Sequence, residues 1–148
     1  MTKPEFPHGL AAIADQYDAI LCDVWGVIHN GQRAFEAACD ALVRFRERGG
    51  GVVLITNAPV PKAQTLRYFG PLGVPPEAFD DCVTSGDATR EELRRRAGEV
   101  FWRLGADEGF EHDRFLYEGL DVQFAGLGEA NTVLCIGLED QFSDEPED

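Results

Sequence analysis

The sequence comprises 148 residues, which is enough for one ordinary domain with a hydrophobic core of its own. Hydrophobic residues make up 44% and charged residues 27%, values typical of globular proteins that exclude a chain disordered throughout. The 27 acidic residues outnumber the 13 basic ones and give a net charge of −14. This charge argues against nucleic acid or an anionic membrane surface as a partner, although a small anionic substrate needs only a local site.

The amino-terminal segment, residues 1–18, contains no apolar run of signal-peptide length. No stretch of the sequence reaches the roughly 18 apolar residues that a membrane span requires. We therefore expect a cytoplasmic protein. The four cysteines are too widely spaced to predict a zinc site or a disulfide framework.

The next segments predict a strand, a helix and a second strand. After a short helix over 9–16, residues 17–23 form an apolar run that ends at Asp23 and is typical of a parallel strand buried on both faces. Residues 35–48 carry apolar side chains at spacings of three and four, which predicts a helix. Residues 51–57 form a second apolar strand. This order requires a parallel sheet with a right-handed crossover.

The carboxyl-terminal half continues the α/β pattern. A helix is expected from Pro61 to Phe69, followed by a short strand that ends near Thr84. Asp87 is a candidate cap for the next helix, and Thr89-x-x-Glu92 has the spacing of a capping box. Further strands are expected within the ranges 100–105, 121–126 and 131–138, with Phe101 and Trp102 in the core and an acidic, solvated end over 139–148.

Polar residues follow the first two predicted strands at their carboxyl ends, where open parallel sheets bind ligands. Asp23 ends the first strand, and Thr56 and Asn57 end the second. An aspartate in this position can attack phosphorus to form an aspartyl-phosphate and can also ligate Mg²⁺. A threonine hydroxyl can hold phosphoryl oxygens. The alternative is that Asp23 only caps a turn and that Thr56 and Asn57 only begin a loop.

The motif "CDVWGVIHNG" over 22–31, followed after one helix by "VVLITNAP" over 52–59, resembles the haloacid dehalogenase superfamily. The finer resemblance is to its class IIA branch, which includes enzymes similar to nitrophenyl phosphatases and to nucleotide or sugar phosphatases. It implies an α/β fold with a Rossmann-like parallel sheet. Residues 1–85 would form the amino-terminal part of the core, and residues 86–148 the first part of an α/β cap, with the downstream core motifs absent.

The resemblance also implies roles for individual residues. Asp23 matches the nucleophile and a ligand of Mg²⁺, and Trp25 would give its backbone carbonyl to the same ion. The loop amides around Trp25 and Gly26 would face the phosphate, together with Thr56 and the Asn57 that follows it. The implied function is a magnesium-dependent phosphatase that acts on a small phosphorylated metabolite. His29 would lie in the flap hairpin beside this site.

Two departures from the family pattern bear on this function. Trp25 stands where the family has a second aspartate, and an indole cannot transfer the proton that this carboxyl group carries to the leaving group. No segment with a strand and a lysine, or with paired aspartates after it, follows residue 98 in the family's order. The alternative is therefore a non-catalytic α/β module that binds a ligand or partner. A sheet lacking its later strands also predicts a homo-oligomer, because it leaves an exposed edge and an apolar face.

Overall fold

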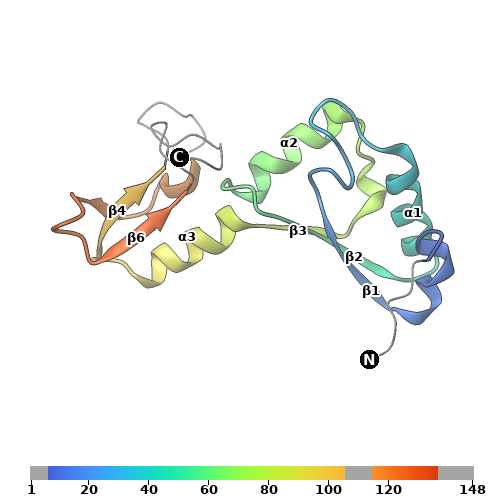
Figure 1. The fold of residues 1–148 in the computed structure, drawn as a ribbon, viewed down its shortest axis with the longest axis horizontal. Helices are drawn as coiled ribbons and strands as arrows, with labels where there is room; N and C mark the ends of the chain where they lie inside the picture. The colour runs from blue at the N-terminus through green and yellow to red at the C-terminus, as the bar shows by residue number, and fades with distance from the viewer. Residues whose placement is uncertain (1–6, 106–114, 137–148) are drawn as a thin grey trace, which may run out of the picture. The chain divides into compact units, whose positions relative to one another are not determined.

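The computed structural model of the protein describes residues 7–105 and 115–136 (Figure 1). The chain divides into two compact units: the first contains residues 1–56 and 62–83, and the second contains 57–61 and 84–148. The predicted acidic end lies outside the described residues. Among the residues that are described, no helix is both long and apolar enough to cross a membrane.

The first unit is built on a three-stranded sheet in the order β1-β2-β3. β1 (Ala19–Asp23) pairs in parallel with β2 (Gly51–Thr56), in a register that places Asp23 opposite Ile55. β3 (Asp81–Thr84) hydrogen-bonds to β2 on its other side. The apolar runs thus form the expected strands, and the predicted α/β fold with a parallel β1–β2 pair is confirmed.

Helices connect these strands along the chain (Figure 1). α1 (Glu36–Glu47) joins β1 to β2, as the apolar stripe predicts. α2 (Lys62–Leu72) runs one turn beyond the expected end at Phe69, with Pro71 inside its last turn. The expected helix over 9–16 is instead two short 3-10 helices, and a third precedes β3: η1 is Leu10–Ala12, η2 is Ala14–Gln16 and η3 is Pro76–Ala78.

The hydrophobic core of the first unit lies between one face of the sheet and the two helices. Alternate residues of a strand point to opposite faces, so every second strand residue contributes to this core. Val52 and Leu54 of β2 are completely buried. The buried side chains packed with them are Cys22 and Cys82 from the neighbouring strands, Cys39, Leu42 and Phe45 from α1, and Phe69 from α2.

The other face of this sheet is largely uncovered in the part of the chain that the structure describes. Leu21 of β1 is 69% exposed, Val83 of β3 is 48% exposed and Ile55 of β2 is 40% exposed. The expectation that β1 is buried on both faces is therefore wrong for the described residues. The apolar run predicted the strand correctly but carried no information about what covers each of its faces.

The second unit contains a smaller sheet in the order β5-β4-β6, and both strand pairs are parallel. Its strands are β4 (Val100–Leu104), β5 (Gln123–Phe124) and β6 (Thr132–Cys135), all within the predicted ranges. A compact core of Leu93, Phe101, Leu116 and Leu134 holds the unit together. The assignment of residues 86–148 to part of a cap stays a prediction.

The helix α3 (Ser85–Arg95) begins earlier than its sequence pattern indicates. Thr84, the last residue of β3, is the N-cap: its Oγ1 accepts a hydrogen bond of 2.9 Å from the Asp87 backbone N–H. The same hydroxyl donates to the Asp87 carboxylate at 3.1 Å. Thr84 and Asp87 therefore form a reciprocal capping pair, whereas Thr89 and Glu92 lie inside the helix.

Candidate functional site

The loop that follows β1 carries the first group of predicted site residues. Asp23 is exposed at the carboxyl end of the strand, and its Oδ1 accepts a hydrogen bond of 2.7 Å from the Val24 backbone N–H. Because Thr56 follows the Ile55 that pairs with Asp23, the two predicted residues end neighbouring parallel strands at the same edge of the sheet. The structure therefore brings Asp23 and Thr56 to one end of the first unit.

Asn57 is the exception among the predicted residues. It directly follows Thr56 but begins the segment 57–61, which belongs to the second unit. Its predicted role beside Asp23 stays a prediction.

Backbone hydrogen bonds fold the loop after Asp23 back on itself. The Gly26 N–H donates to the His29 carbonyl at 2.8 Å, and the Ile28 N–H donates to the Val24 carbonyl at 3.0 Å. Gly26 adopts a φ of 76°, in the left-handed region that glycine tolerates best. Val24 and Ile28 are buried and anchor the loop in the core. The intervening residues consequently face outward on a fixed backbone.

The His29 side chain is buried within this loop, and the sequence did not predict that burial. Only 7% of the side chain is exposed, and its Nδ1 accepts a hydrogen bond of 3.0 Å from the Gly31 N–H. Burial lowers the pKa of His29 from its ordinary value. The side chain is therefore a neutral imidazole at neutral pH, with its proton on Nε2. It is a structural element of the loop, and its ring also contacts Phe69 at a centroid distance of 6.0 Å.

Trp25 has the opposite environment, since 65% of it is exposed. Its ring contacts the His29 ring edge to face, with a centroid distance of 5.5 Å and an interplanar angle of 85°. The outer carbons of its six-membered ring lie against Gly31, where a Cβ atom would come within 2.4 Å of the indole. Gly31 thus provides the space that the indole occupies.

Candidate metal ligands at this edge are oxygen atoms, the type that Mg²⁺ prefers. The Asp23 carboxylate is exposed, and the Trp25 carbonyl accepts no hydrogen bond from another described residue. Both groups therefore fit the predicted role. Within the described ranges no cluster of three or more histidine, cysteine, aspartate or glutamate side chains is assembled to hold a metal ion.

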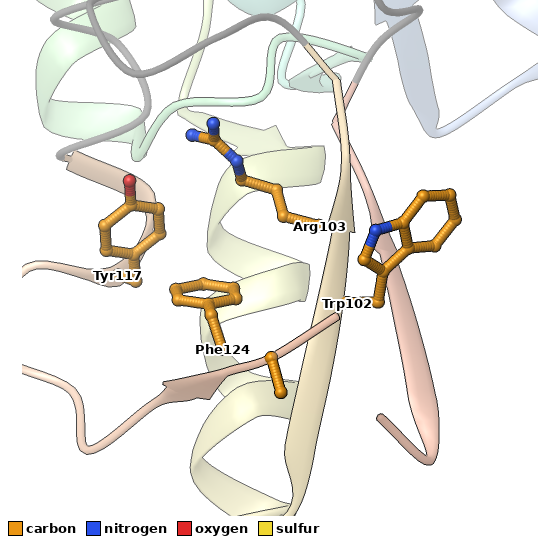
Figure 2. Close-up of a pocket in the computed structure, with 5 residues that line it drawn as sticks. Trp102, Arg103, Tyr117 and Phe124 are labelled. Atoms are coloured by element: carbon orange, nitrogen blue, oxygen red, sulfur yellow. The ribbon is translucent and has the colours of Figure 1, made fainter. Parts of the chain in front are cut away.

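A pocket in the second unit was not predicted from the sequence. It has a volume of about 310 Å³ and is lined by residues of β4, of the segment between β4 and β5, of β5 and of the position after β5: Trp102, Arg103, Tyr117, Phe124 and Ala125. Figure 2 shows the Arg103, Tyr117 and Phe124 side chains on one side of β4 and the Trp102 indole on the other. The Tyr117 and Phe124 rings pack edge to face at 5.3 Å. Phe101 is core as expected, whereas its neighbour Trp102 borders this pocket.

Comparison with known proteins gives one family and several solved structures. A family model described as haloacid dehalogenase-like hydrolase matches residues 20–114. A hydrolase of the haloacid dehalogenase-like family from Brucella suis 1330 is 40% identical, with a TM-score of 0.78 over 97% of this chain and 53% of that one. No curated protein matches the chain.

Two further solved structures share the fold. NagD from Escherichia coli K-12 is 28% identical, with a TM-score of 0.55 over 80% of this chain and 46% of that one. A glycerol phosphate phosphatase from Mycobacterium tuberculosis, solved in complex with magnesium, is 20% identical, with a TM-score of 0.57 over 88% of this chain and 39% of that one. The chain thus spans about half, or less, of the length of these solved relatives.

Proposed function

Because the chain belongs to the family of haloacid dehalogenase-like hydrolases, we propose that it takes part in a magnesium-dependent phosphatase reaction on a small phosphorylated molecule. The observation that carries this proposal is the exposed Asp23 carboxylate at the carboxyl end of β1, next to the end of β2. The names of two solved relatives, a phosphatase and a hydrolase, support the same class of reaction. A cytoplasmic location is part of the proposal.

In the proposed first step, a carboxylate oxygen of Asp23 attacks the phosphorus atom and the bond from phosphorus to the ester oxygen breaks. Water then attacks the phosphorus of the aspartyl-phosphate, releases inorganic phosphate and restores the carboxylate. Thr56 and the backbone N–H of Trp25 hold the phosphoryl oxygens, with Asn57 beside them. The Gly26 N–H, which the resemblance also places at the phosphate, instead donates to the His29 carbonyl. Mg²⁺, held by Asp23 and the Trp25 carbonyl, would neutralise charge on the phosphoryl group.

Trp25 restricts which esters can react. An indole cannot protonate the departing oxygen, and loss of a general acid typically lowers a rate by roughly 10²- to 10⁴-fold. His29 does not replace the missing acid, because it is neutral, 7% exposed and engaged with the Gly31 N–H. We therefore expect slow turnover of aryl or acyl phosphates, whose leaving groups depart as anions, and much slower turnover of sugar phosphates.

The second candidate function is a non-catalytic module that binds a phosphorylated ligand or a partner. It is favoured by one observation, the indole of Trp25 at the position where the resemblance leads one to expect a carboxyl group. The two functions differ in whether phosphorus becomes bonded to Asp23.

The test uses beryllium fluoride, which binds to a carboxylate in the manner of a phosphoryl group. With Mg²⁺ present, ¹⁹F NMR should detect its binding to the unmodified chain, and Asp23→Asn should abolish it. The matched control is Asp18→Asn, because Asp18 is exposed at the opposite end of β1. Equal binding by the unmodified protein and the Asp23 variant would remove Asp23 from the chemistry, and binding of phosphate without fluoride adducts would favour the non-catalytic module.

A further inference from the structure

Trp25 is an exposed aromatic side chain in a loop that is otherwise well anchored. Two-thirds of it faces outward, while Val24 before it and Ile28 after it are at most 3% exposed. A large aromatic side chain that only filled space in this loop would be expected to point toward the core. The loop instead holds the indole on its outer side.

The indole is held in place before any ligand binds. Gly31, with a φ of 79°, has no Cβ atom and lets the outer ring carbons approach its backbone. The His29 ring meets the indole at 85°, and His29 is itself fixed by its hydrogen bond to the Gly31 N–H. A side chain that is fixed in this way loses little conformational entropy when a ligand packs against it.

The position of Trp25 in the chain places it close to the proposed reaction centre. Two residues along the chain span at most about 7 Å, so the backbone of Trp25 lies within that distance of Asp23. A planar group one bond away from a phosphoryl group on Asp23 would therefore lie near Trp25. The His29 ring contacts the indole edge to face, and most of the indole remains exposed as an aromatic surface.

We propose that Trp25 determines substrate specificity by stacking against a planar aromatic leaving group, so that the substrate class is aryl phosphates. This inference rests on the proposed phosphatase function, because Asp23 must bind the phosphoryl group while the indole binds the ring. Stacking and leaving-group chemistry then select the same molecules: the aromatic ring that packs on Trp25 also stabilises the oxygen that departs without a proton.

The test compares two ligands that cannot be hydrolysed, phenylphosphonate and cyclohexylphosphonate. They have similar size and charge, but only the first is planar. The unmodified protein with Mg²⁺ should bind phenylphosphonate roughly 2- to 12-fold more tightly, which is the range that contacts between aromatic rings contribute beyond area burial. In Trp25→Leu the two dissociation constants, measured by ³¹P NMR titration, should become equal, and Trp25→Phe should retain the preference.

Fluorescence provides a second readout because the chain contains two tryptophans, Trp25 and Trp102. In Trp102→Phe the remaining emission comes from Trp25, and saturating phenylphosphonate should quench it while cyclohexylphosphonate should not. Equal affinity of the unmodified protein for both ligands, or a preference that persists in Trp25→Leu, would overturn the stacking proposal and leave the proposed phosphatase function standing. Failure of both phosphonates to bind would overturn both proposals.

Discussion

The two ends of the first sheet each carry an aspartate, and the two carboxylates have different surroundings. At the amino end of β2, Asp80 accepts hydrogen bonds from the Arg46 guanidinium, at 3.0 Å from Nε, and from the Val52 backbone N–H at 2.7 Å. At the carboxyl end of β1, the Asp23 carboxylate accepts one hydrogen bond from the described part of the chain, donated by its neighbour Val24. The comparison indicates that Asp80 ties α1 to the sheet, whereas the Asp23 carboxylate keeps the capacity to bind another group.

Replacing each carboxylate by an amide in a separate variant should distinguish these roles. We expect these two substitutions to have the largest effects. Asp23→Asn should abolish magnesium-dependent binding of beryllium fluoride and leave the urea midpoint of unfolding unchanged. Asp80→Asn should lower the urea midpoint, because Arg46 loses a charged partner, and should leave fluoride binding intact. Loss of both properties in either variant would show that the two ends are not independent.

Restoring a proton donor at the Asp23 end should produce the next largest effect. Trp25→Asp should raise the turnover of glucose 6-phosphate by up to roughly 10²- to 10⁴-fold, and that of phenyl phosphate by less, since only the alkoxide needs the proton. Steady-state release of inorganic phosphate measures both rates. Trp25→Asn is the matched control, because it has nearly the same size as aspartate and no acid. Rapid hydrolysis of glucose 6-phosphate by the unmodified protein would contradict this account.

The Asp80 carboxylate should contribute to the pH dependence of the free energy of unfolding. Hydrogen bonds from Arg46 and from the Val52 N–H hold the pKa of Asp80 below its ordinary value. A carboxyl group whose pKa is lower in the folded state stabilises the fold above its unfolded pKa of about 3.9, and that contribution is lost as the pH falls through the folded pKa. Urea unfolding between neutral pH and pH values below about 4 should therefore show a steeper loss of stability than in Asp80→Asn. Parallel profiles for the two proteins would exclude this role.

The smallest effect that we expect comes from a substitution on the uncovered face of the sheet, between its two ends, and concerns the association of the protein with itself. We propose that this face and the edge strand β1 allow two copies of the chain to associate, because exposed edges and apolar patches favour pairing. Leu21→Lys should then shift the protein toward the monomer in sedimentation velocity experiments. Tyr68→Lys is a suitable control, since Tyr68 is similarly exposed but lies on α2. A monomer at high concentration before any substitution would contradict the proposal.

The sequence predicted those features that depend on local pattern. The apolar runs located β1 and β2, the spacing of three and four located α1, and the end of β1 placed Asp23 at the edge where ligands bind. The start of α3 was misjudged because Thr84-x-x-Asp87 and Thr89-x-x-Glu92 both have the capping spacing. The end of β3 decides between them, and that end is set by pairing with a distant strand.

Other features depend on contacts that the sequence order does not reveal. An apolar strand has the same pattern whether one or both of its faces are covered, so the exposure of Leu21 could not be foreseen. His29 is polar by composition and buried by the loop around it. The pocket of the second unit joins Arg103 to Tyr117 and Phe124, which different segments supply. The segment "VFWRLG" was a weak indication of this pocket, because tryptophan and arginine are neighbours on one strand there.

The contact between Trp25 and Gly31 couples the effects of substitutions at these two positions. An alanine at position 31 would meet the indole at 2.4 Å and would also adopt an unfavourable φ of 79°. In the presence of Trp25 the substitution therefore carries two penalties, whereas beside a small residue only the backbone penalty remains. A double-mutant cycle of Trp25→Ala and Gly31→Ala should consequently be non-additive. The effect of a substitution at either position therefore depends on the residue at the other.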